Sequence, residues 1–400
     1  MKSTQFIELE KEFGAHNYKP LDVVIDRGEG VWVYDTDGNQ YLDCLSAYSA
    51  INQGHVHPKI LEALVSQAKK LTLTSRAFYN NQLPLMYQEL CQLTGYEMAI
   101  AMNSGAEAVE TALKIVRKYA YQVRGIESNN AEIIVADGNF HGRTITIVSF
   151  SSDPLYRENF GPFTPGFVSV PYNDAPAIEK LITKRTIGVL IEPIQGEGGV
   201  IIPDEGYLKQ VADICQRNDI LLIADEIQTG LGRTGRLFAC DHENVRPDVM
   251  IIGKALSGGF YPVSAVLADK NILGLFTPGE HGSTFGGNPL GAAVARAAIK
   301  VLTEEKLIEN AAIMGEDFAE RLSEIPQKKI KEIRAKGLMI GVEIKEEYGS
   351  ARKYCEYLRE QGILAKETHE TTIRFAPPLI IDRETINWAI PRIQTALAND

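Results

Sequence analysis

Apolar residues in the middle of the chain gather in short, unbroken runs. Such runs are typical of β-strands that are covered on both faces, as in a parallel sheet. We expect six strands of this kind, at 98–103, 132–137, 188–193, 220–226, 248–253 and 263–268. Each ends close to a polar or glycine residue, which indicates where the strand stops.

Helical spacing of apolar residues separates the first two runs. The stripe consists of Val109, Ala112, Leu113, Val116, Tyr119, Ala120 and Val123. Residues three and four apart lie on one face of a helix, so this stripe predicts an amphipathic helix packed on the sheet. Strands alternating with helices predict an α/β layer with a mostly parallel sheet.

The pattern changes after about residue 292. Long helical patterns fill 292–325, and two strand-like segments, "GLMIGVEIK" and "TTIRFAPPLII", flank a helix expected near 351–361. We therefore predict a large domain over 57–303 and a small α+β domain over 304–400. The segment 1–56 is expected to contribute to the small domain and to subunit contacts.

Composition narrows the classes of partner and compartment. The 400 residues carry a formal net charge of -11, which argues against nucleic acid or an anionic membrane as the main partner. The five cysteines contain no C-x-x-C pair, so we expect free thiols in a reducing compartment. No apolar run has membrane-spanning length and no signal-like segment opens the chain, so we expect a cytoplasmic protein. Removal of an earlier presequence stays open.

Three segments carry candidate chemistry, and each also has a purely structural interpretation. Lys254, just after the run at 248–253, is either a surface lysine at a strand end or a reactive amine. Asp225 ends another strand, where an aspartate often caps a turn. Ser104 and Glu107 have capping-box spacing, yet the amides that follow Ser104 would also suit a phosphate.

Taken together, the three segments favour chemistry. A lysine for a covalent bond, a carboxylate for the ring nitrogen and a phosphate cradle are the groups that pyridoxal phosphate requires. In open α/β sheets, ligands bind beyond the carboxyl ends of the strands, where Lys254 and Asp225 are expected. No metal site is expected, because the H-x-H of "GHVHP" has no further ligands.

The segment "GLGRTG" (230–235) matches a dinucleotide fingerprint. No helical stripe follows it, as that fingerprint would require, so we do not expect a nicotinamide or flavin site. Arg233 and Arg236, within and beside this loop, are expected to pair with carboxylates.

Four motifs, "NSGAEAVETALKIVRKY", "IEPIQGEGG", "ADEIQTGLGRTG" and "GKALSGGFYPVSAV", resemble the class III (subgroup II) pyridoxal-phosphate aminotransferases. The resemblance implies fold type I, with a mostly parallel mixed sheet in a large domain and a small α+β domain. Flanking segments, among them "SAYSAINQGHVHPKI", "LTSRAFYNN" and "IRFAPPL", are similar to the family members that act on ornithine. That similarity implies a ping-pong transfer of the δ-amine of L-ornithine to 2-oxoglutarate. The products would be glutamate 5-semialdehyde and glutamate, in ornithine breakdown or proline synthesis.

The resemblance also implies which residues hold the cofactor. Lys254 would bond to it covalently and move the proton, and Asp225 would pair with its ring nitrogen. The remaining contacts would come from Gln228 to the ring hydroxyl, from Phe140 by stacking on the ring, and from Ser104, Gly105 and Ala106 to the phosphate. Thr284 would reach the phosphate in a neighbouring subunit, which implies a homodimer.

Substrate contacts are implied in the same way. Arg374 would bind the α-carboxylate of glutamate or 2-oxoglutarate, and Arg143 a second carboxylate. Tyr18 and Tyr48 would shape the ornithine pocket. Glu197 would neutralise Arg374 when ornithine enters, because one site must offer an arginine to glutamate and hide it from ornithine. Where some relatives carry tryptophan after the stacking phenylalanine, this chain has His141.

Alternatives remain within and outside this family. The substrate could be N-acetylornithine or 4-aminobutyrate, which comparative activity would decide. The chain could instead be a non-catalytic binding protein, or, more remotely, a nucleotide-dependent oxidoreductase.

Overall fold

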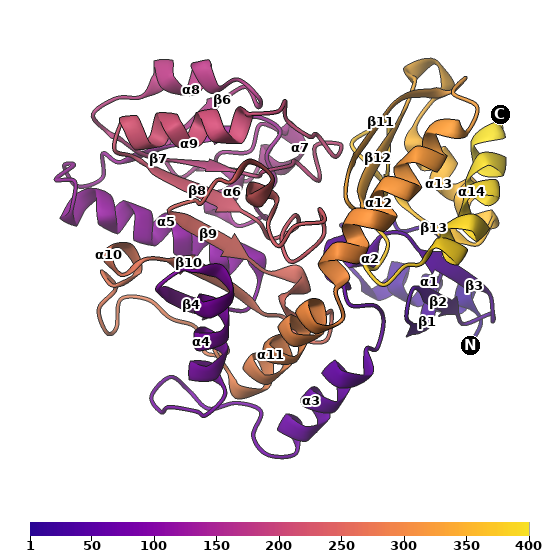
Figure 1. Ribbon diagram of the computed structural model, residues 1–400, viewed down its shortest axis with the longest axis horizontal. Coiled ribbons are helices and arrows are strands. Elements are labelled where there is room, and N and C mark those ends of the chain that lie inside the picture. Colours follow the sequence, from indigo (N-terminus) through magenta and orange to yellow (C-terminus); the bar gives the residue numbers. More distant parts are fainter. Residues whose placement is uncertain (400) are drawn as a thin grey trace.

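The computed structural model of the protein describes residues 1–399. Its centre is a seven-stranded sheet of order β4-β10-β9-β8-β7-β5-β6, seen in the left half of Figure 1. The strands are β4 (Met98–Met102), β5 (Glu132–Ala136), β6 (Phe167–Val170), β7 (Thr186–Ile191), β8 (Leu221–Asp225), β9 (Val249–Ile252) and β10 (Ser264–Ala268). Strands β5 to β9 pair in parallel, and β10 is antiparallel to both β9 and β4.

All six predicted strands are therefore present, and the mostly parallel sheet is confirmed. The prediction missed β6, a four-residue edge strand that is only partly buried. Its sequence, "FVSV", contains a serine and lacks the long apolar run of the central strands, so its pattern is weak.

Helices cover both faces of this sheet, which explains the unbroken apolar runs. On one face, α5 (Gly105–Gln122) packs Ala112 and Val116 into a core with Ile251 of β9. The other face is covered by α8 (Ala175–Leu181) and α9 (Tyr207–Arg217). The expected stripe runs along α5 with one exception, since Val123 lies beyond the helix end and is exposed.

A second sheet lies in the right half of the view in Figure 1. It is antiparallel, with the order β11 (Ile330–Lys336), β12 (Met339–Ile344), β15 (Thr372–Phe375) and β14 (Lys366–Thr368). Around it lie α12 (Leu307–Glu324), α13 (Ala351–Glu360) and α14 (Arg383–Ala398). The helical pattern at 292–325 proves to be two helices, α11 (Pro289–Glu304) and α12, because Lys306 adopts a left-handed φ of 55° between them.

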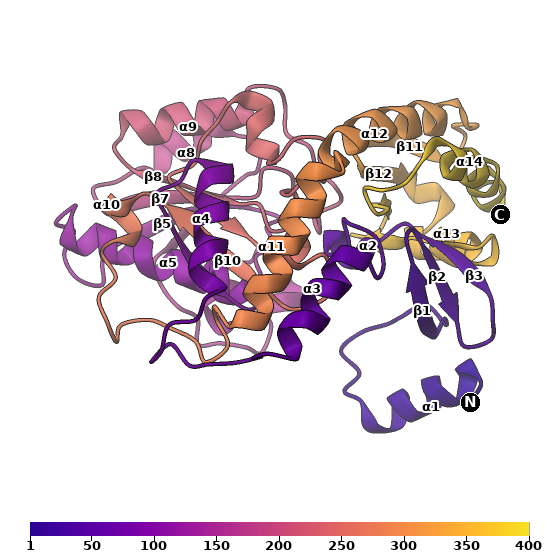
Figure 2. The same cartoon turned by 60° about the horizontal axis from the view of Figure 1, so that its bottom comes forward.

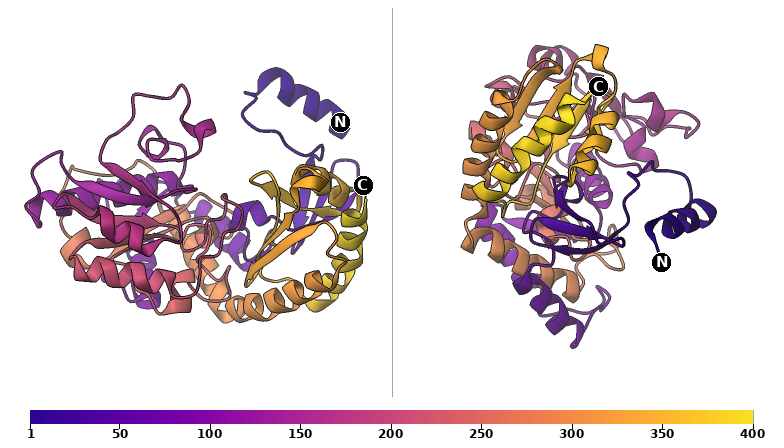
Figure 3. Two further views of the ribbon diagram at one scale, coloured as in Figure 1. Left: turned by 90° about the horizontal axis from the view of Figure 1, so that it is seen from above. Right: turned by 90° about the vertical axis from the view of Figure 1, so that its right-hand side faces the viewer.

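The N-terminal segment joins the C-terminal part of the chain. Strands β1 (Ile25–Glu29), β2 (Trp32–Asp35) and β3 (Gln40–Asp43) form a third sheet, to which β13 (Ile363–Leu364) adds in parallel beside β3. Helix α1 (Ser3–Phe13) lies at the edge of the molecule, at the end of a long connection (Figures 2 and 3), and its first residue, Ser3, bonds Thr36 at 2.8 Å. The domain division expected from the sequence, with its boundaries, stays a prediction.

The remaining elements connect these layers. Helices α3 (Pro58–Ala68), α4 (Leu83–Thr94) and α11 lie together on one flank of the large sheet. Short helical turns are α2 (Ser46–Ser49), α6 (Ile145–Val148), α7 (Pro154–Arg157), α10 (Lys270–Leu273) and the 3-10 turns at Ala239–Glu243, Lys254–Ser257 and Glu346–Tyr348. Within residues 1–399, no helix has the length and apolar character needed to cross a membrane.

Candidate active site

Lys254 lies at the carboxyl end of the large sheet, two residues after the buried strand β9. Its φ is 42°, in the left-handed region that a lysine rarely adopts, and such strain is typical of functional sites. The side chain borders a cavity of about 150 Å³, and burial lowers its pKa. The cavity is lined by Gly105, Ala106, Phe140, His141, Gly142, Glu192, Ile194, Asp225, Ile227, Gln228, Thr229 and Lys254.

Asp225, the last residue of β8, is buried in this cavity wall and bonded on both oxygens. One oxygen accepts the amide N–H of Ile227 at 3.1 Å, and the other lies 2.7 Å from Nδ1 of His141. Burial lowers the pKa of His141, but the hydrogen bond and the charge of Asp225 outweigh burial, so the net shift is upward. A protonated His141 would form an ion pair with one oxygen of Asp225. The carboxylate would then be oriented so that it can also face a cationic group in the cavity.

Glu192, just after β7, is a second buried carboxylate in the cavity wall. Burial raises its pKa to about 7, with the nearby positive charge of His141 opposing that shift. Its carboxylate accepts the amide N–H of Phe140 at 2.9 Å. Glu192 therefore fixes the backbone of the aromatic residue that borders the cavity.

The start of α5 forms another wall. The capping box predicted at Ser104 is present: Ser104 Oγ accepts the N–H of Glu107 at 3.2 Å, and Glu107 Oε2 accepts the N–H of Ser104 at 2.9 Å. Gly105 and Ala106 therefore open the helix, and first-turn amides have no carbonyl within the helix to bond. A side chain at Gly142 would lie 3.0 Å from the Ala106 Cβ, so a glycine is needed there.

Glu197, Gln228 and Arg374 meet beside Lys254. Arg374 Nη1 donates to Glu197 Oε1 at 2.7 Å and to Gln228 Oε1 at 3.1 Å, and Gln228 Nε2 donates to Glu197 Oε1 at 3.3 Å. Arg374 is buried, while its Nε and Nη2 have no hydrogen-bond partner among the described residues. The arginine charge of Arg374 lowers the pKa of Glu197 against the opposing effect of burial, which is the larger single influence.

Tyr48 covers the guanidinium of Arg374, whose Cζ lies 4.8 Å from the centre of the phenol ring. The tyrosine belongs to a left-handed turn in which Ser46, Ala47, Tyr48 and Ser49 all have positive φ. Asp43 Oδ1 accepts the amide of Ser46 at 2.9 Å, and Ser46 Oγ donates to the Ala376 carbonyl at 2.7 Å. These bonds hold a strained turn that local sequence pattern does not indicate.

Two further predicted residues lie at the mouth of the site. Arg143 is exposed, and its Cζ lies 5.7 Å from the ring centre of Phe140 and 4.8 Å from that of Tyr156. Tyr18 is 66% exposed, and its ring centre is 6.0 Å from Arg143 Cζ. The N-terminal segment thus reaches the mouth without closing it.

Two predicted cofactor residues do not line the cavity. Ser104 is exposed and its hydroxyl caps α5. Thr284 is exposed in a turn that is tied to the large sheet, since Asn103 Nδ2 donates to Ser283 Oγ at 2.8 Å. Within one chain, Thr284 therefore faces outward.

The expectation that Arg233 pairs with a carboxylate is wrong. Its guanidinium is fully buried and donates to the carbonyls of Leu338 and Pro377, at 2.8 and 2.6 Å, and to Asn52 Oδ1 at 2.7 Å. The "GLGRTG" loop thus packs between the two large parts of the chain, where carbonyl groups replace a carboxylate as acceptors.

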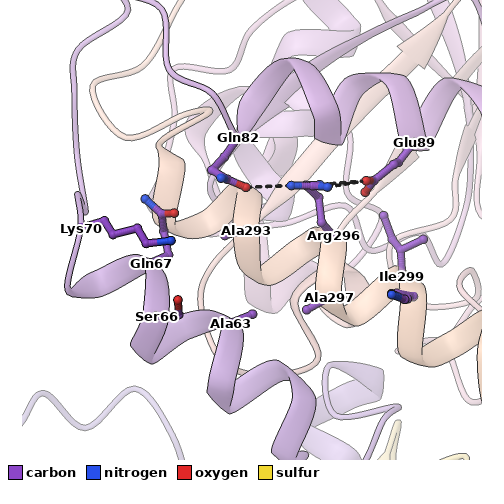
Figure 4. Close-up of a pocket in the computed structure, with 11 residues that line it drawn as sticks. Ala63, Ser66, Gln67, Lys70, Gln82, Glu89, Ala293, Arg296, Ala297 and Ile299 are labelled. Atoms are coloured by element: carbon purple, nitrogen blue, oxygen red, sulfur yellow. Dashed lines mark hydrogen bonds and ion pairs between the residues drawn. The ribbon is translucent and has the colours of Figure 1, made fainter.

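A hollow of about 570 Å³, larger than the cavity beside Lys254, lies elsewhere, between α3, α4 and α11 (Figure 4). Arg296 crosses it and bonds Gln82 Oε1 at 2.8 Å and Glu89 Oε1 at 2.9 Å. None of the residues expected to carry chemistry lines it, so size alone would indicate the wrong site.

The cavity beside Lys254 fits pyridoxal phosphate by its donor set. It combines an amine, a carboxylate paired with histidine, an aromatic ring and the open amides of a helix start. The sequence interpretation overlooked the roles of His141 and Glu192 in positioning Asp225 and Phe140. The available signals were a histidine directly after Phe140 and a glutamate at the end of an apolar strand.

Comparisons with known proteins agree with this geometry. A family model described as class-III aminotransferase matches residues 13–397. An ornithine aminotransferase from Brevibacillus brevis is 59% identical over 396 residues, covering 99% of this chain and 98% of that protein. The ornithine aminotransferase from Toxoplasma gondii, crystallised with oxidised glutathione and partially occupied by PLP, has a TM-score of 0.98 at 44% identity, covering 99% of this chain and 94% of that one. An acetylornithine aminotransferase from Elizabethkingia anophelis has a TM-score of 0.91 at 49% identity, covering 100% and 99%. The chain belongs to the class-III aminotransferases.

Proposed function

We propose that this protein is an ornithine δ-aminotransferase that passes the amine to 2-oxoglutarate. The observation that carries the proposal is the ion pair between Glu197 and Arg374 at 2.7 Å, bridged by Gln228, next to Lys254. A buried arginine paired with a carboxylate suits a site that accepts two different amino donors in turn. The high identity to ornithine aminotransferases supports the same substrate.

The class-III aminotransferases use pyridoxal phosphate, which supplies an aldehyde for the amine and a ring that withdraws electrons from the reacting carbon. We propose that Lys254 bonds to it and Asp225 holds its ring nitrogen protonated. Gln228, Phe140 and the start of α5, Ser104 to Ala106, would complete its binding site in this subunit. Ser104 would contribute from the rim, through its backbone and its cap.

Lys254 is suited to hold and release a proton at Nζ. Burial lowers the pKa of its amine, and the charge of Arg374 acts in the same direction, while the carboxylates of Glu197 and Asp225 oppose it. A lowered pKa increases the neutral fraction of the amine near pH 7, and only that neutral form accepts a proton.

The position of the negatively charged α-carboxylate distinguishes the two amino donors, ornithine and glutamate. Ornithine reacts at its δ-amine, so its own α-carboxylate lies far from the reacting end. Glutamate reacts at its α-amine, so its α-carboxylate lies beside the cofactor and needs Arg374. We propose that Glu197 neutralises Arg374 for ornithine and leaves it for glutamate, while Arg143 binds the distal carboxylate and Tyr18 and Tyr48 line the ornithine pocket.

We also propose a homodimer in which Thr284 contacts the phosphate held by the partner subunit. Exposed aromatic residues support this, since Phe78, Tyr79 and Phe285 lie on segments joined by the bond from Asn80 Nδ2 to the Gly287 carbonyl at 3.2 Å. The five unpaired cysteines support a reducing compartment such as the cytoplasm. Arginine and ornithine breakdown or proline synthesis would be the pathway.

The test is the visible spectrum of the purified protein mixed separately with L-ornithine, N-acetylornithine and 4-aminobutyrate. We expect loss of the cofactor's absorption band with ornithine alone, followed by recovery with 2-oxoglutarate. N-acetylornithine is the second candidate, because of the similarity to an acetylornithine aminotransferase. A band that responds to N-acetylornithine and not to ornithine would replace the proposed substrate.

A further inference from the structure

The loop that carries Glu197 begins at the end of a strand of the seven-stranded sheet. Its backbone, however, is bonded to the antiparallel sheet of β11, β12, β15 and β14, called the small sheet below. The loop follows β7, and its base is closed by reciprocal backbone bonds between Gln195 and Ile201 at 3.1 and 2.9 Å. Between these residues, four backbone carbonyls accept hydrogen bonds from side chains of the β11-β12-β15-β14 sheet. These bonds fix the position of the loop relative to that sheet.

Thr368, the last residue of β14, provides the first contact. Its buried hydroxyl lies 2.8 Å from the carbonyl oxygen of Glu197 and 3.1 Å from that of Gly196. A hydroxyl has a single proton, so the two carbonyls share one donor. The backbone of Glu197 is thus bonded directly to the small sheet.

Arg334, on β11, provides the second contact. Its Nη2 lies 2.8 Å from the Gly199 carbonyl oxygen, and its Nε lies 3.1 Å from that of Val200. The opposite edge of the guanidinium is held by Glu332 at 2.6 Å and by Glu343. Carboxylates on one edge fix the direction in which the other edge faces the loop.

The partner of Glu197 stands on the same sheet. Arg374 lies on β15, where it is paired across the strands with Lys366 of β14. On its other side the loop lies against Gln228, since a Cβ at Gly196 would lie 1.9 Å from Gln228 Oε1. Both members of the Glu197–Arg374 pair are therefore positioned by one sheet.

We propose that Thr368 and Arg334 are positioning residues that hold the Glu197 carboxylate on Arg374 and thereby set the preference between the two amino donors. This inference rests on the proposed function, because it explains how the cover on Arg374 stays in place. Loosening either contact lets Glu197 leave Arg374 more readily. The site then favours molecules that bring a carboxylate to Arg374.

Thr368→Val tests this, because valine keeps the shape and removes the donor. Thr368→Ser keeps the donor and serves as the rescue variant. Thr303→Val is the matched control, since the Thr303 hydroxyl on α11 also approaches two carbonyls, those of Ile299 and Lys300, at 3.1 and 3.2 Å. Arg334→Lys is the second variant, which keeps the charge but loses the paired donors.

The first readout is the affinity for glutarate, a dicarboxylate that has no amine and therefore cannot react. Glutarate is titrated into each cofactor-loaded variant, and binding is measured by calorimetry. We expect roughly threefold to tenfold tighter glutarate binding in Thr368→Val, the effect of losing about one hydrogen bond. Thr368→Ser and Thr303→Val are expected to match the parent. In kinetics, the KM for glutamate falls by a similar factor while its kcat is unchanged, and the KM for ornithine rises.

Hydrogen exchange of the 196–201 segment is the third readout, and it is expected to speed up in Thr368→Val and Arg334→Lys alone. Unchanged glutarate affinity in both variants would overturn the inference, as would an equal change in Thr303→Val. Failure of the proposed function is seen separately, as a parent protein that does not react with ornithine. The glutarate titration would still decide whether the loop contacts control Arg374.

Discussion

His141 Nδ1 lies 2.7 Å from Asp225 Oδ2, and both side chains are buried. Asp225 is the residue proposed to face the ring nitrogen of the cofactor, so His141 stands behind it and fixes its direction. Removing one partner of a buried pair leaves the other without compensation, which is strongly destabilising.

His141→Phe is therefore expected to lower the free energy of unfolding of the cofactor-free protein by about 3–5 kcal/mol at pH 6. His141→Asn, whose amide N–H stands near the position of Nδ1, is the control and should lose less. Because the folded pKa of His141 is raised above 6.5, its stabilising contribution is complete below pH 6.5 and is lost as pH rises through the folded value. Urea unfolding from pH 6 to 9 measures this. A difference between parent and His141→Phe that grows with pH would contradict the pairing.

Glu192 predicts a pH dependence of its own. Its folded pKa is raised to about 7 from an unfolded value of 4.5, so the folded state keeps a proton between these values. Stability therefore falls as pH rises from 4.5 to 7, by roughly 3 kcal/mol if Glu192 acts alone. Glu192→Gln, which still accepts the Phe140 amide, is expected to remove most of this decline. His141 and Lys254 also titrate beside it, so the same measurement in His141→Asn separates the share of the histidine. An unchanged decline in Glu192→Gln would show that another group causes it.

Lys254→Ala is expected to reduce turnover by orders of magnitude while leaving the fold intact. The change removes both the covalent link and the group that moves the proton. Single-turnover absorbance and circular dichroism check the two parts separately. Turnover at the parent level would mean that Lys254 is only a strand-end lysine.

Glu197→Ala is expected to expose Arg374 and to shift the ratio of kcat/KM toward glutamate by roughly tenfold to a hundredfold, the effect of losing a charged hydrogen bond. Glu205→Ala, at an exposed site, is the control. Half-reaction rates with ornithine and glutamate give the ratio. Equal selectivity in the variant and the parent would remove Glu197 from the account of donor choice.

Tyr79→Glu is expected to separate the proposed dimer, because Tyr79 is 96% exposed in the single chain and a buried charge would oppose association. Cofactor affinity should weaken with it, since Thr284 would no longer reach the partner's site. Ile313→Glu on α12, 56% exposed, is the control. Sedimentation velocity and cofactor titration are the measurements, and a variant that sediments like the parent would exclude this face.

Much of the large domain could be read from local pattern. The six apolar runs became strands, and the stripe after Ser104 became α5, because each depends on neighbours a few positions away. The capping box at Ser104 and the strand-end places of Lys254 and Asp225 were predictable for the same reason. The edge strand β6 was not predicted, because a partly buried strand does not need a continuous run of apolar residues.

Only the tertiary structure decided how these parts meet. Glu197 and Arg374 are 177 positions apart, and the order of strands in two sheets brings them to 2.7 Å. The left-handed turn that places Tyr48 on Arg374 is held by the Asp43 carboxylate and by the distant carbonyl of Ala376, and no local propensity favours it. The sequence by itself determined which elements form and which residues end them. Tertiary packing determined the partners of His141, Arg233 and Thr368, because those hydrogen bonds join groups that no periodicity relates.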